Sequence, residues 1–300
     1  MQKKILITGS NGLLGQKLMQ FFALHTDFKV VGASRGKNRL TSVSNFKYYN
    51  ANLSDSNVLE EILLTEKPTI IINCVAMTNV DQCEENKTEC DQINVETVKS
   101  IVNYCKENDA KLIHLSTDFV FDGKKGNYKE TDLVNPLNYY GMSKLKSENL
   151  ITNNLIDFAI IRTILVYGTT ENTNRGNIVS WVKENLENNK DINVVNDQLR
   201  MPTLVDDLVK AIDLVIAKNA KGIFHISSNE LLSIYDIALI IAKEFNLDVN
   251  KIHEIKTNQL NQKAIRPLKT GFILEKAKNE LGFESHSFRE QMKVYKAYLN

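Results

Sequence analysis

The 300-residue sequence predicts an α/β fold built on a parallel sheet, and three observations support this prediction. Short β-branched runs alternate with helix-length amphipathic stretches through the first half of the chain. Residues 69–74 (TIIINC) form a continuous apolar run, which is typical of a strand covered on both faces. A glycine-rich turn joins the first strand to the first helix. We therefore expect right-handed crossovers and a doubly wound, Rossmann-type sheet with helices on both faces.

The strands of this sheet are expected where short apolar runs occur, and the helices where apolar residues recur on one face. Residues 57–65 illustrate the second pattern, because Leu59, Ile62 and Leu63 fall on one side of a helix. Strands are predicted at residues 4–8, 29–33, 46–50, 69–74, 111–116 and 158–162. Helices are predicted at about 14–24, 57–65, 88–108 and 136–153.

The pattern loosens after Tyr167, where a polar loop at 169–175 begins a second region. Its predicted helices are at 177–188, 204–218, 233–245, 274–281 and 287–298, and its main strands at 192–195 and 223–227. We place the first domain at 1–168 and expect its sheet to be completed from about 192–227. Residues 169–191 and 228–300 are assigned to a smaller C-terminal α/β lobe.

Composition and charge exclude several classes of protein. Lys plus Arg number 37 and Asp plus Glu 36, so the net charge of +1 does not fit a broadly basic nucleic-acid binder. No apolar stretch reaches the about 20 residues of a membrane span, and residues 1–8 lack the features of a signal peptide. The four cysteines form no C-x-x-C pair, so no metal site is expected. These features predict a cytoplasmic protein with neither nucleic-acid nor membrane partners.

The segment TGSNGLLG at residues 8–15 carries the first functional signal. Its glycines allow a tight turn and a close approach of the backbone to a pyrophosphate at the helix N-terminus. The alternative is a merely structural turn, but its place after the first strand of a parallel α/β pattern favours a dinucleotide site in domain 1–168. The expected contacts are Gly9, Ser10, Asn11, Gly12, Leu13, Leu14 and Gly15.

The end of the second strand bears on the choice of cofactor. An NAD site usually places an acidic residue there, about 20 residues beyond the glycines, to bind the ribose 2′-hydroxyl. This chain has Ala33-Ser34-Arg35-Gly36-Lys37 and no acid. Arg35 can pair with a 2′-phosphate and Ser34 can donate a hydrogen bond to it, so NADP(H) is expected in preference to NAD(H). A solvated basic loop is the alternative.

Tyr140 and Lys144 form a Y-x-x-x-K pair on a predicted helix, where side chains four residues apart share one face. A cation beside a phenol lowers the pKa of the phenol and favours proton exchange with a carbonyl oxygen. An ordinary surface pair is the alternative. Thr117 follows the preceding strand, at the edge of the sheet where ligands bind, and its hydroxyl can join Tyr140 on a carbonyl. His114, inside that strand, is expected to be a packed core histidine.

At this point the chain resembles the extended short-chain dehydrogenase/reductases, and within them the dTDP-4-dehydrorhamnose reductases and their relatives. The resemblance covers nearly the whole chain, through TGSNGLLG (8–15), NCVAMTNVDQCEEN (73–86), STDFVFDG (116–123), PLNYYGMSK (136–144), IRTILVYG (161–168), DQLRMPT (197–203) and RPLKTGF (266–272). It implies that Thr117, Tyr140 and Lys144 are catalytic and that Lys144 also holds the nicotinamide ribose. Further cofactor contacts are implied at Tyr140, Asn52, Leu53, Val75, Ala76 and Met77. Asn73 is implied to line the adenine side together with Val75 and Ala76, and Asn94 to support the active-site backbone.

The chain departs from the patterns of this superfamily at three positions. Dehydratases carry a glutamate directly after the T-D pair, where this chain has Phe119, so ketone reduction is favoured over dehydration. The reductases often carry an aromatic residue at the Leu165 position and a small one at the Arg200 position. Substrate contacts are expected from Asp118, Phe119, Asn177, Arg200 and Arg266, the last because an arginine can bind a diphosphate with two hydrogen bonds.

Together these features predict an NADP-preferring reductase of a nucleotide-linked 4-keto sugar, with Tyr140 as the proton donor and residues 169–191 and 228–300 as the substrate-binding lobe. One alternative is a non-catalytic, dinucleotide-binding regulatory subunit similar to that of methionine adenosyltransferase. Another is a nucleotide-sugar epimerase that retains NAD. The complete Thr117–Tyr140–Lys144 set favours an enzyme. The oligomeric state is left open, although dimers are common in the superfamily.

Overall fold

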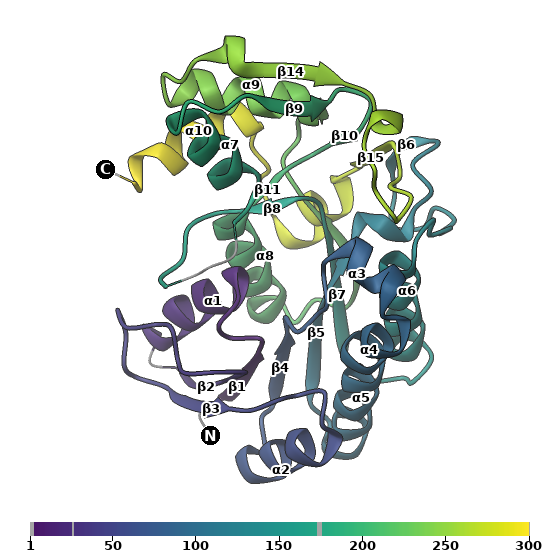
Figure 1. Cartoon of the computed structure of the whole chain (residues 1–300). Coiled ribbons are helices and arrows are strands. Elements are labelled where there is room, and N and C mark those ends of the chain that lie inside the picture. The colour runs from purple at the N-terminus through teal and green to yellow at the C-terminus, as the bar shows by residue number, and fades with distance from the viewer. Residues whose placement is uncertain (1–2, 26, 173–175, 300) are drawn as a thin grey trace.

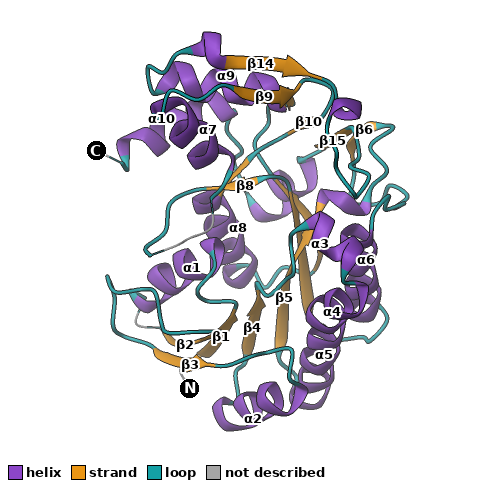
Figure 2. Ribbon diagram, in the orientation of Figure 1, coloured by secondary structure: helices purple, strands orange, loops and turns teal. Residues whose placement is uncertain are grey.

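The computed structural model describes residues 3–25, 27–172 and 176–299, so part of the predicted loop 169–175 lies outside the described residues. Within these ranges a seven-stranded sheet has the order β12-β7-β5-β4-β1-β2-β3, and every pairing is parallel (Figures 1 and 2). The strand order reverses between β1 and β4, as in a Rossmann-type fold. The predicted fold class is therefore confirmed. The strands are β1 (Lys3–Thr8), β2 (Phe28–Ser34), β3 (Lys47–Asn50), β4 (Ile70–Asn73), β5 (Lys111–Thr117), β7 (Phe158–Thr163) and β12 (Gly222–Ile226).

Helices cover both faces of this sheet, which explains its continuous apolar strands. In β1, Ile5 and Ile7 pack on one face with α1 (Leu13–Ala23) and α8 (Val205–Ala217), whereas Leu6 packs on the other. That second face is covered by α2 (Ser56–Glu66), α5 (Thr97–Asn108) and α6 (Tyr139–Thr152). Alternate residues of one strand thus serve two separate cores.

Capping residues determine where the helices begin. The Asp55 carboxylate accepts from the Asn57 N–H and starts α2, and the Asn138 side chain accepts from the Gly141 N–H at 2.9 Å and starts α6. The helix predicted from about residue 136 therefore begins three residues later. The single helix predicted at 88–108 is also interrupted, because a π-helical turn at Gln92–Glu96 joins α4 (Lys87–Asp91) to α5. A short helix that was not predicted, α3 (Val80–Glu85), precedes them.

The C-terminal part of the chain adds a lobe that Figure 1 shows above the sheet. Its core lies among α7 (Ile178–Glu187), α9 (Ile234–Glu244) and α10 (Phe288–Ala297). Of the stretch 192–227, only β12 joins the main sheet. The expectation for 192–195 was wrong: β9 (Ile192–Val195) pairs with β14 (Ile252–Ile255), because Ile192 and Val194 pack in the lobe. The remaining strands are short and form two further small sheets: β6 (Gly126–Tyr128), β10 (Leu199–Arg200), β13 (Leu232–Ser233) and β15 (Lys269–Phe272) in one, and β8 (Val166–Tyr167) and β11 (Thr203–Leu204) in the other. A π-helical turn, Ala277–Leu281, ends the helix predicted at 274–281.

None of the helices in the described ranges combines the length and the apolar character that a membrane crossing requires. Packing within the hydrophobic cores stabilises the tertiary structure, and a buried ion pair connects α6 to β7. Both partners, Glu148 and Arg162, are 3% exposed, and Arg162 donates two hydrogen bonds, at 3.0 and 2.6 Å, to the two carboxylate oxygens. The Ser116 hydroxyl of β5 donates to the same carboxylate at 2.5 Å. These contacts join α6 to two strands of the sheet.

Removal of one member of this pair should destabilise the protein strongly. Glu148→Gln leaves the Arg162 guanidinium buried without a compensating charge, and we expect the free energy of unfolding to fall by about 3–5 kcal/mol. Urea denaturation followed by circular dichroism measures this change. Glu187→Gln is the control, because its pair with Lys183 is on the surface and should contribute less than about 1 kcal/mol. Equal losses in the two variants would contradict the assignment.

Candidate active site

The glycine-rich turn between β1 and α1 forms a cradle that is suited to an anionic group. A Cβ at Gly15 would collide with the Gly9 carbonyl, and one at Gly9, whose φ is +68°, would lie 2.9 Å from the Cys74 carbonyl carbon. Gly12 is the N-cap of α1 and contributes no side-chain cap, which leaves the first N–H groups of the helix available to a ligand. The Ser10 hydroxyl is buried and makes no hydrogen bond to any described residue. These features fit the pyrophosphate of a dinucleotide.

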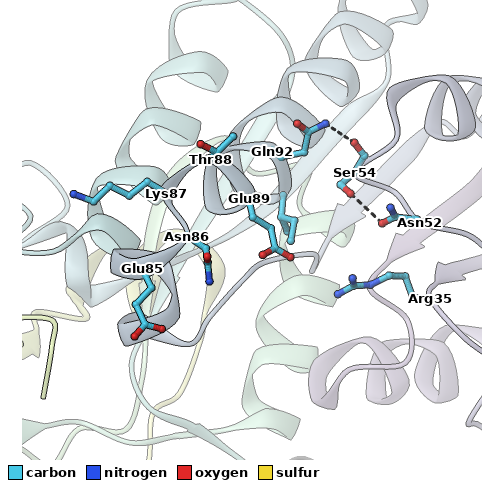
Figure 3. A pocket seen from close by; sticks show the side chains of 10 residues that line it. Arg35, Asn52, Ser54, Glu85, Asn86, Lys87, Thr88, Glu89 and Gln92 are labelled. Atoms are coloured by element: carbon cyan, nitrogen blue, oxygen red, sulfur yellow. Dashed lines mark hydrogen bonds between the residues drawn. The ribbon is translucent and has the colours of Figure 1, made fainter.

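Asn11 holds the basic loop that follows β2. Its amide nitrogen donates to the carbonyls of Arg35 and Lys37 at 3.1 and 3.0 Å, and its amide oxygen accepts from the Arg39 N–H. Arg35 lines a pocket of about 520 Å³ together with Asn52, and Figure 3 shows both side chains on the same side of it. The opposite wall comes from residues 85–93 and carries both acidic and basic side chains, so the pocket is not uniformly positive.

The remaining predicted cofactor contacts divide between the core and the loop after β4. Leu14 and Leu53 are buried in the two cores, one on each side of the sheet. In the loop, the Met77 N–H donates to the Asn94 amide oxygen at 2.7 Å, and the Met77 carbonyl accepts from the Asn94 amide nitrogen. The interrupted helix thus brings Asn94 from the π-helical turn to the backbone beside Val75 and Ala76. Sequence reasoning expected this support from Asn94 but not the turn that places it.

Helix α6 brings Tyr140 beside the loop that follows Thr117. A Cβ at Gly141 would collide with the Phe119 carbonyl oxygen, so a glycine is needed for this close approach. The rings of Phe119 and Tyr140 meet edge to face, with centroids 5.9 Å apart. Thr117 ends β5 and Lys144 lies one helical turn beyond Tyr140. The structure therefore places all three predicted catalytic residues at the carboxyl end of the sheet, where ligands of such folds bind.

Lys144 is 2% exposed, and its Nζ lies 3.0 Å from His114 Nε2. Burial lowers the pKa of Lys144 to about 8, and Glu148 opposes this effect. His114 is fully buried, as expected of a core histidine, but its ring also contacts Asn73 Nδ2 through Nδ1 at 3.1 Å. Sequence reasoning missed this connection. The strand period contains a signal for it, because His114 and Leu112 point to the face of β5 that α6 covers.

Asp118 and Arg200, both predicted substrate contacts, are engaged within the protein. The Asp118 carboxylate accepts from the hydroxyls of Thr117 and Thr270, at 3.1 and 2.5 Å, and lies 3.6 Å from Arg200 Nε. Burial raises the pKa of Asp118 despite these partners. Arg200 is 4% exposed, donates to three backbone carbonyls and packs over the Phe119 ring. Its guanidinium therefore braces the wall of the site.

The other two polar candidates also have internal partners. The Asn177 side chain caps α7 and donates to the Gly168 carbonyl at 2.8 Å. Arg266 makes a two-point ion pair with Asp81, at 3.1 and 2.8 Å, and lines a second pocket of about 680 Å³. Among the five predicted substrate contacts, Phe119 thus lies beside Tyr140 and Arg266 borders a pocket. The roles of all five toward a substrate stay predictions.

The chain is similar in sequence to a known protein family and to curated proteins. The RmlD substrate binding domain family matches residues 3–299 of the chain. Among curated proteins, the chain is 31% identical over 258 residues to methionine adenosyltransferase 2 subunit beta of Bos taurus, covering 84% of this chain and 75% of the relative. It is 27% identical over 307 residues to dTDP-4-dehydrorhamnose reductase of Aggregatibacter actinomycetemcomitans, covering 98% of this chain and 99% of the relative.

The fold is also similar to solved structures of proteins named as dTDP-4-dehydrorhamnose reductases. A dTDP-4-dehydrorhamnose reductase of Clostridium acetobutylicum superposes with a TM-score of 0.87 at 28% identity, covering 99% of each chain. The Bacillus anthracis enzyme of that name, solved in complex with NADP, superposes with a TM-score of 0.85 at 26% identity, covering 99% of this chain and 100% of its own. The chain therefore belongs to the RmlD substrate binding domain family, within the extended short-chain dehydrogenase/reductases.

Proposed function

We propose that the protein is an NADP(H)-preferring reductase of a nucleotide-linked 4-keto sugar. The observation that carries this proposal is the convergence of Thr117, Tyr140 and the buried Lys144 at the carboxyl end of the sheet that also bears the glycine cradle. Two solved relatives that are named dTDP-4-dehydrorhamnose reductases superpose over 99% of the chain, which supports an NAD(P)-dependent reductase. The expected site of action is cytoplasmic.

The dinucleotide would be held by the turn at 9–15, by Ser34 and Arg35, and by the loop at 75–77. When bound, it supplies the hydride that reduces the ketone carbon. The backbone N–H groups of the cradle neutralise the pyrophosphate charge, and Arg35 offers a charged partner for a 2′-phosphate. Lys144, with Tyr140, is expected to contact the nicotinamide ribose.

The protein's own side chains would handle the proton. The Tyr140 hydroxyl donates its proton to the carbonyl oxygen as negative charge develops there. A charged Lys144 one turn away stabilises the phenolate that remains, which lowers the pKa of the phenol. The Thr117 hydroxyl orients the carbonyl oxygen by turning its proton away from Asp118, its partner in the present structure. Phe119 offers no exchangeable proton at this position, which supports simple reduction rather than dehydration.

A second candidate rests on the bovine relative, which is named as a subunit of methionine adenosyltransferase. In that case the chain would bind a dinucleotide and a partner protein without catalysing turnover. The two candidates differ in what Tyr140 does. A regulatory protein needs the shape of the site, whereas a reductase also needs the phenolic proton.

Replacement of Tyr140 tests the proposed proton donor. Tyr140→Phe should lower kcat by at least about 100-fold, because general acid catalysis typically contributes 10²–10⁴-fold, while NADPH affinity changes little. Steady-state kinetics with a panel of nucleotide 4-keto sugars, beside fluorescence titration of NADPH, provide both numbers. Tyr139→Phe is the matched control, because its hydroxyl bonds to Asp91 outside the site. Turnover that survives in Tyr140→Phe would reject this role, and a wild type that binds NADPH but reduces no sugar would favour the regulatory candidate.

The pH dependence of kcat should report Lys144. Its pKa of about 8 means that it is charged below that pH and neutral above it. The stabilisation of the phenolate is therefore present at pH 7 and lost as pH rises through 8, so kcat should fall by about tenfold per unit at higher pH. Kinetics between pH 6 and 10 test this expectation. Lys146→Met, which alters an exposed lysine on the same helix, should keep the profile. A flat profile up to pH 10 would contradict the assignment.

Arg35 should determine the cofactor preference. Loss of its charge-assisted bond in Arg35→Ala should reduce the preference for NADPH over NADH by roughly 1–3 kcal/mol, or about 5- to 150-fold. Titration of both dinucleotides into the two proteins measures the change. The exposed neighbour Lys37 provides the control variant Lys37→Ala, which should keep the preference. Equal affinities for the two cofactors in the wild type would show that the basic loop is only solvated.

A further inference from the structure

A line of buried hydrogen bonds leads from Lys144 into the centre of the sheet. It passes from Lys144 Nζ to His114 Nε2 at 3.0 Å, and from His114 Nδ1 to Asn73 Nδ2 at 3.1 Å. The Asn73 amide oxygen accepts from the Thr8 hydroxyl at 2.6 Å and from the Val75 N–H at 3.2 Å. Lys144 is 2% exposed, Asn73 1%, and His114 and Thr8 are fully buried. Each proton in this line therefore needs a partner within the protein.

The backbone determines how the Asn73 amide is oriented. The Val75 N–H can only donate, so the amide oxygen must face it and the amide nitrogen must face the imidazole. His114 Nδ1 is then an acceptor. Because burial lowers the pKa of His114 well below its usual value, the ring is neutral. A neutral ring with an accepting Nδ1 carries its hydrogen on Nε2.

That hydrogen points at Lys144. An ammonium group has only hydrogen-bond donors, so a charged Lys144 would face the imidazole N–H with a second donor and form no hydrogen bond to it. A neutral amine has a lone pair that can accept from the imidazole N–H. A charged Lys144 could keep the bond only if His114 moved its proton to Nδ1. The Asn73 amide would then have to turn and leave the Val75 N–H without its acceptor.

We propose that His114, oriented by Asn73, is a positioning residue that presents an N–H to Lys144 and thereby favours the neutral amine. The consequence of this inference rests on the proposed function: the contact with His114 would make Lys144 lose its charge within the pH range in which the reductase works. It goes beyond that function because it assigns control of the charge on Lys144 to His114 and Asn73, neither of which touches the substrate or the reacting atoms.

The other groups around the lysine do not replace this effect. Glu148, on the same helix, favours the charged form, but its carboxylate is already paired with Arg162 of β7. Cys74, after β4, is neutral, because burial raises its pKa to about 12. Cys90 of α4 also favours the charged lysine, and Tyr140 lies one turn away on α6. Among these described neighbours of Lys144, the imidazole N–H of His114 is therefore the group that we infer to oppose the charge, in addition to burial.

Nuclear magnetic resonance on the 300-residue protein without cofactor tests the proposal directly. The ¹⁵N shifts of His114 should identify the form protonated on Nε2, and the ¹³Cε shift of Lys144 should titrate near pH 8. Asn73→Asp places a carboxylate against His114 Nδ1, which moves the imidazole proton there and turns Nε2 into an acceptor. His114→Gln likewise allows an oxygen to face the lysine. In both variants the Lys144 midpoint should rise by about one pH unit or more.

The exposed histidine variant His253→Gln is the control, and its Lys144 midpoint should stay at the wild-type value. The high-pH limb of kcat should move with the midpoint in Asn73→Asp. A wild-type His114 protonated on Nδ1 would overturn the proposal even if a variant fails to fold. So would folded variants whose Lys144 midpoints equal that of the wild type. Absence of turnover with keto sugars would reject the proposed function alone, because the shifts are measured without substrate.

Discussion

The close packing of α6 against β5 is the constraint on which the candidate site depends. Three side-chain positions on one face of the helix meet the sheet in succession: Gly141 against the Phe119 carbonyl, Lys144 against His114, and Glu148 against Arg162. The spacing of three and four residues keeps them on one line. The contacts along most of this line are polar. A shift of the helix by even a fraction of a turn would separate Tyr140 from the strand end and unpair buried charges at the same time.

Other charged side chains near the site are also paired within the protein. Arg200 and Asp118 satisfy each other together with backbone carbonyls and Thr270, and Arg266 satisfies Asp81. The Arg266 guanidinium holds the pKa of Asp81 below its usual range, so this pair stays ionised at neutral pH. A phosphate that approached Arg266 would compete with a carboxylate already in place. A phosphate could therefore bind to Arg266 only by replacing Asp81 as the partner of the guanidinium.

The sequence predicts the sheet well because continuous β-branched runs such as 69–74 have few alternatives to a strand covered on both faces. It predicts the glycine turn and the shared helix of Tyr140 and Lys144 from local spacing, and the position of Thr117 from the end of its strand, while the catalytic roles of these residues stay predictions. It fails where partners come from distant segments. The strand at 192–195 is apolar enough for either sheet, and only its pairing with β14 decides between them.

The same limit applies to the polar residues that the sequence predicts as substrate contacts. Asn177 and Arg200 have the chemistry of ligand contacts, but the helix end and the carbonyls that occupy them are visible only in three dimensions. His114 was expected in the core and is there, yet its contact with Lys144 depends on which face of β5 the helix covers. The residue type and its position in the sequence indicate which contacts a side chain can make, but the tertiary structure determines which partner it has.

The π-helical turn at 92–96 has a consequence for how this region tolerates change. It accommodates one extra residue within a nearly continuous helix, and this phase shift lets Asn94 and Thr97, 1% and 3% exposed, both face the interior. Deletion of a single residue here would close the wide turn into an ordinary α-helical one, because the bulge is where the extra residue is absorbed. The Asn94 amide would then leave the position from which it bonds to the Met77 backbone, although α5 could keep its apolar face. Related chains should accordingly vary in residue type along this segment far more readily than in its length.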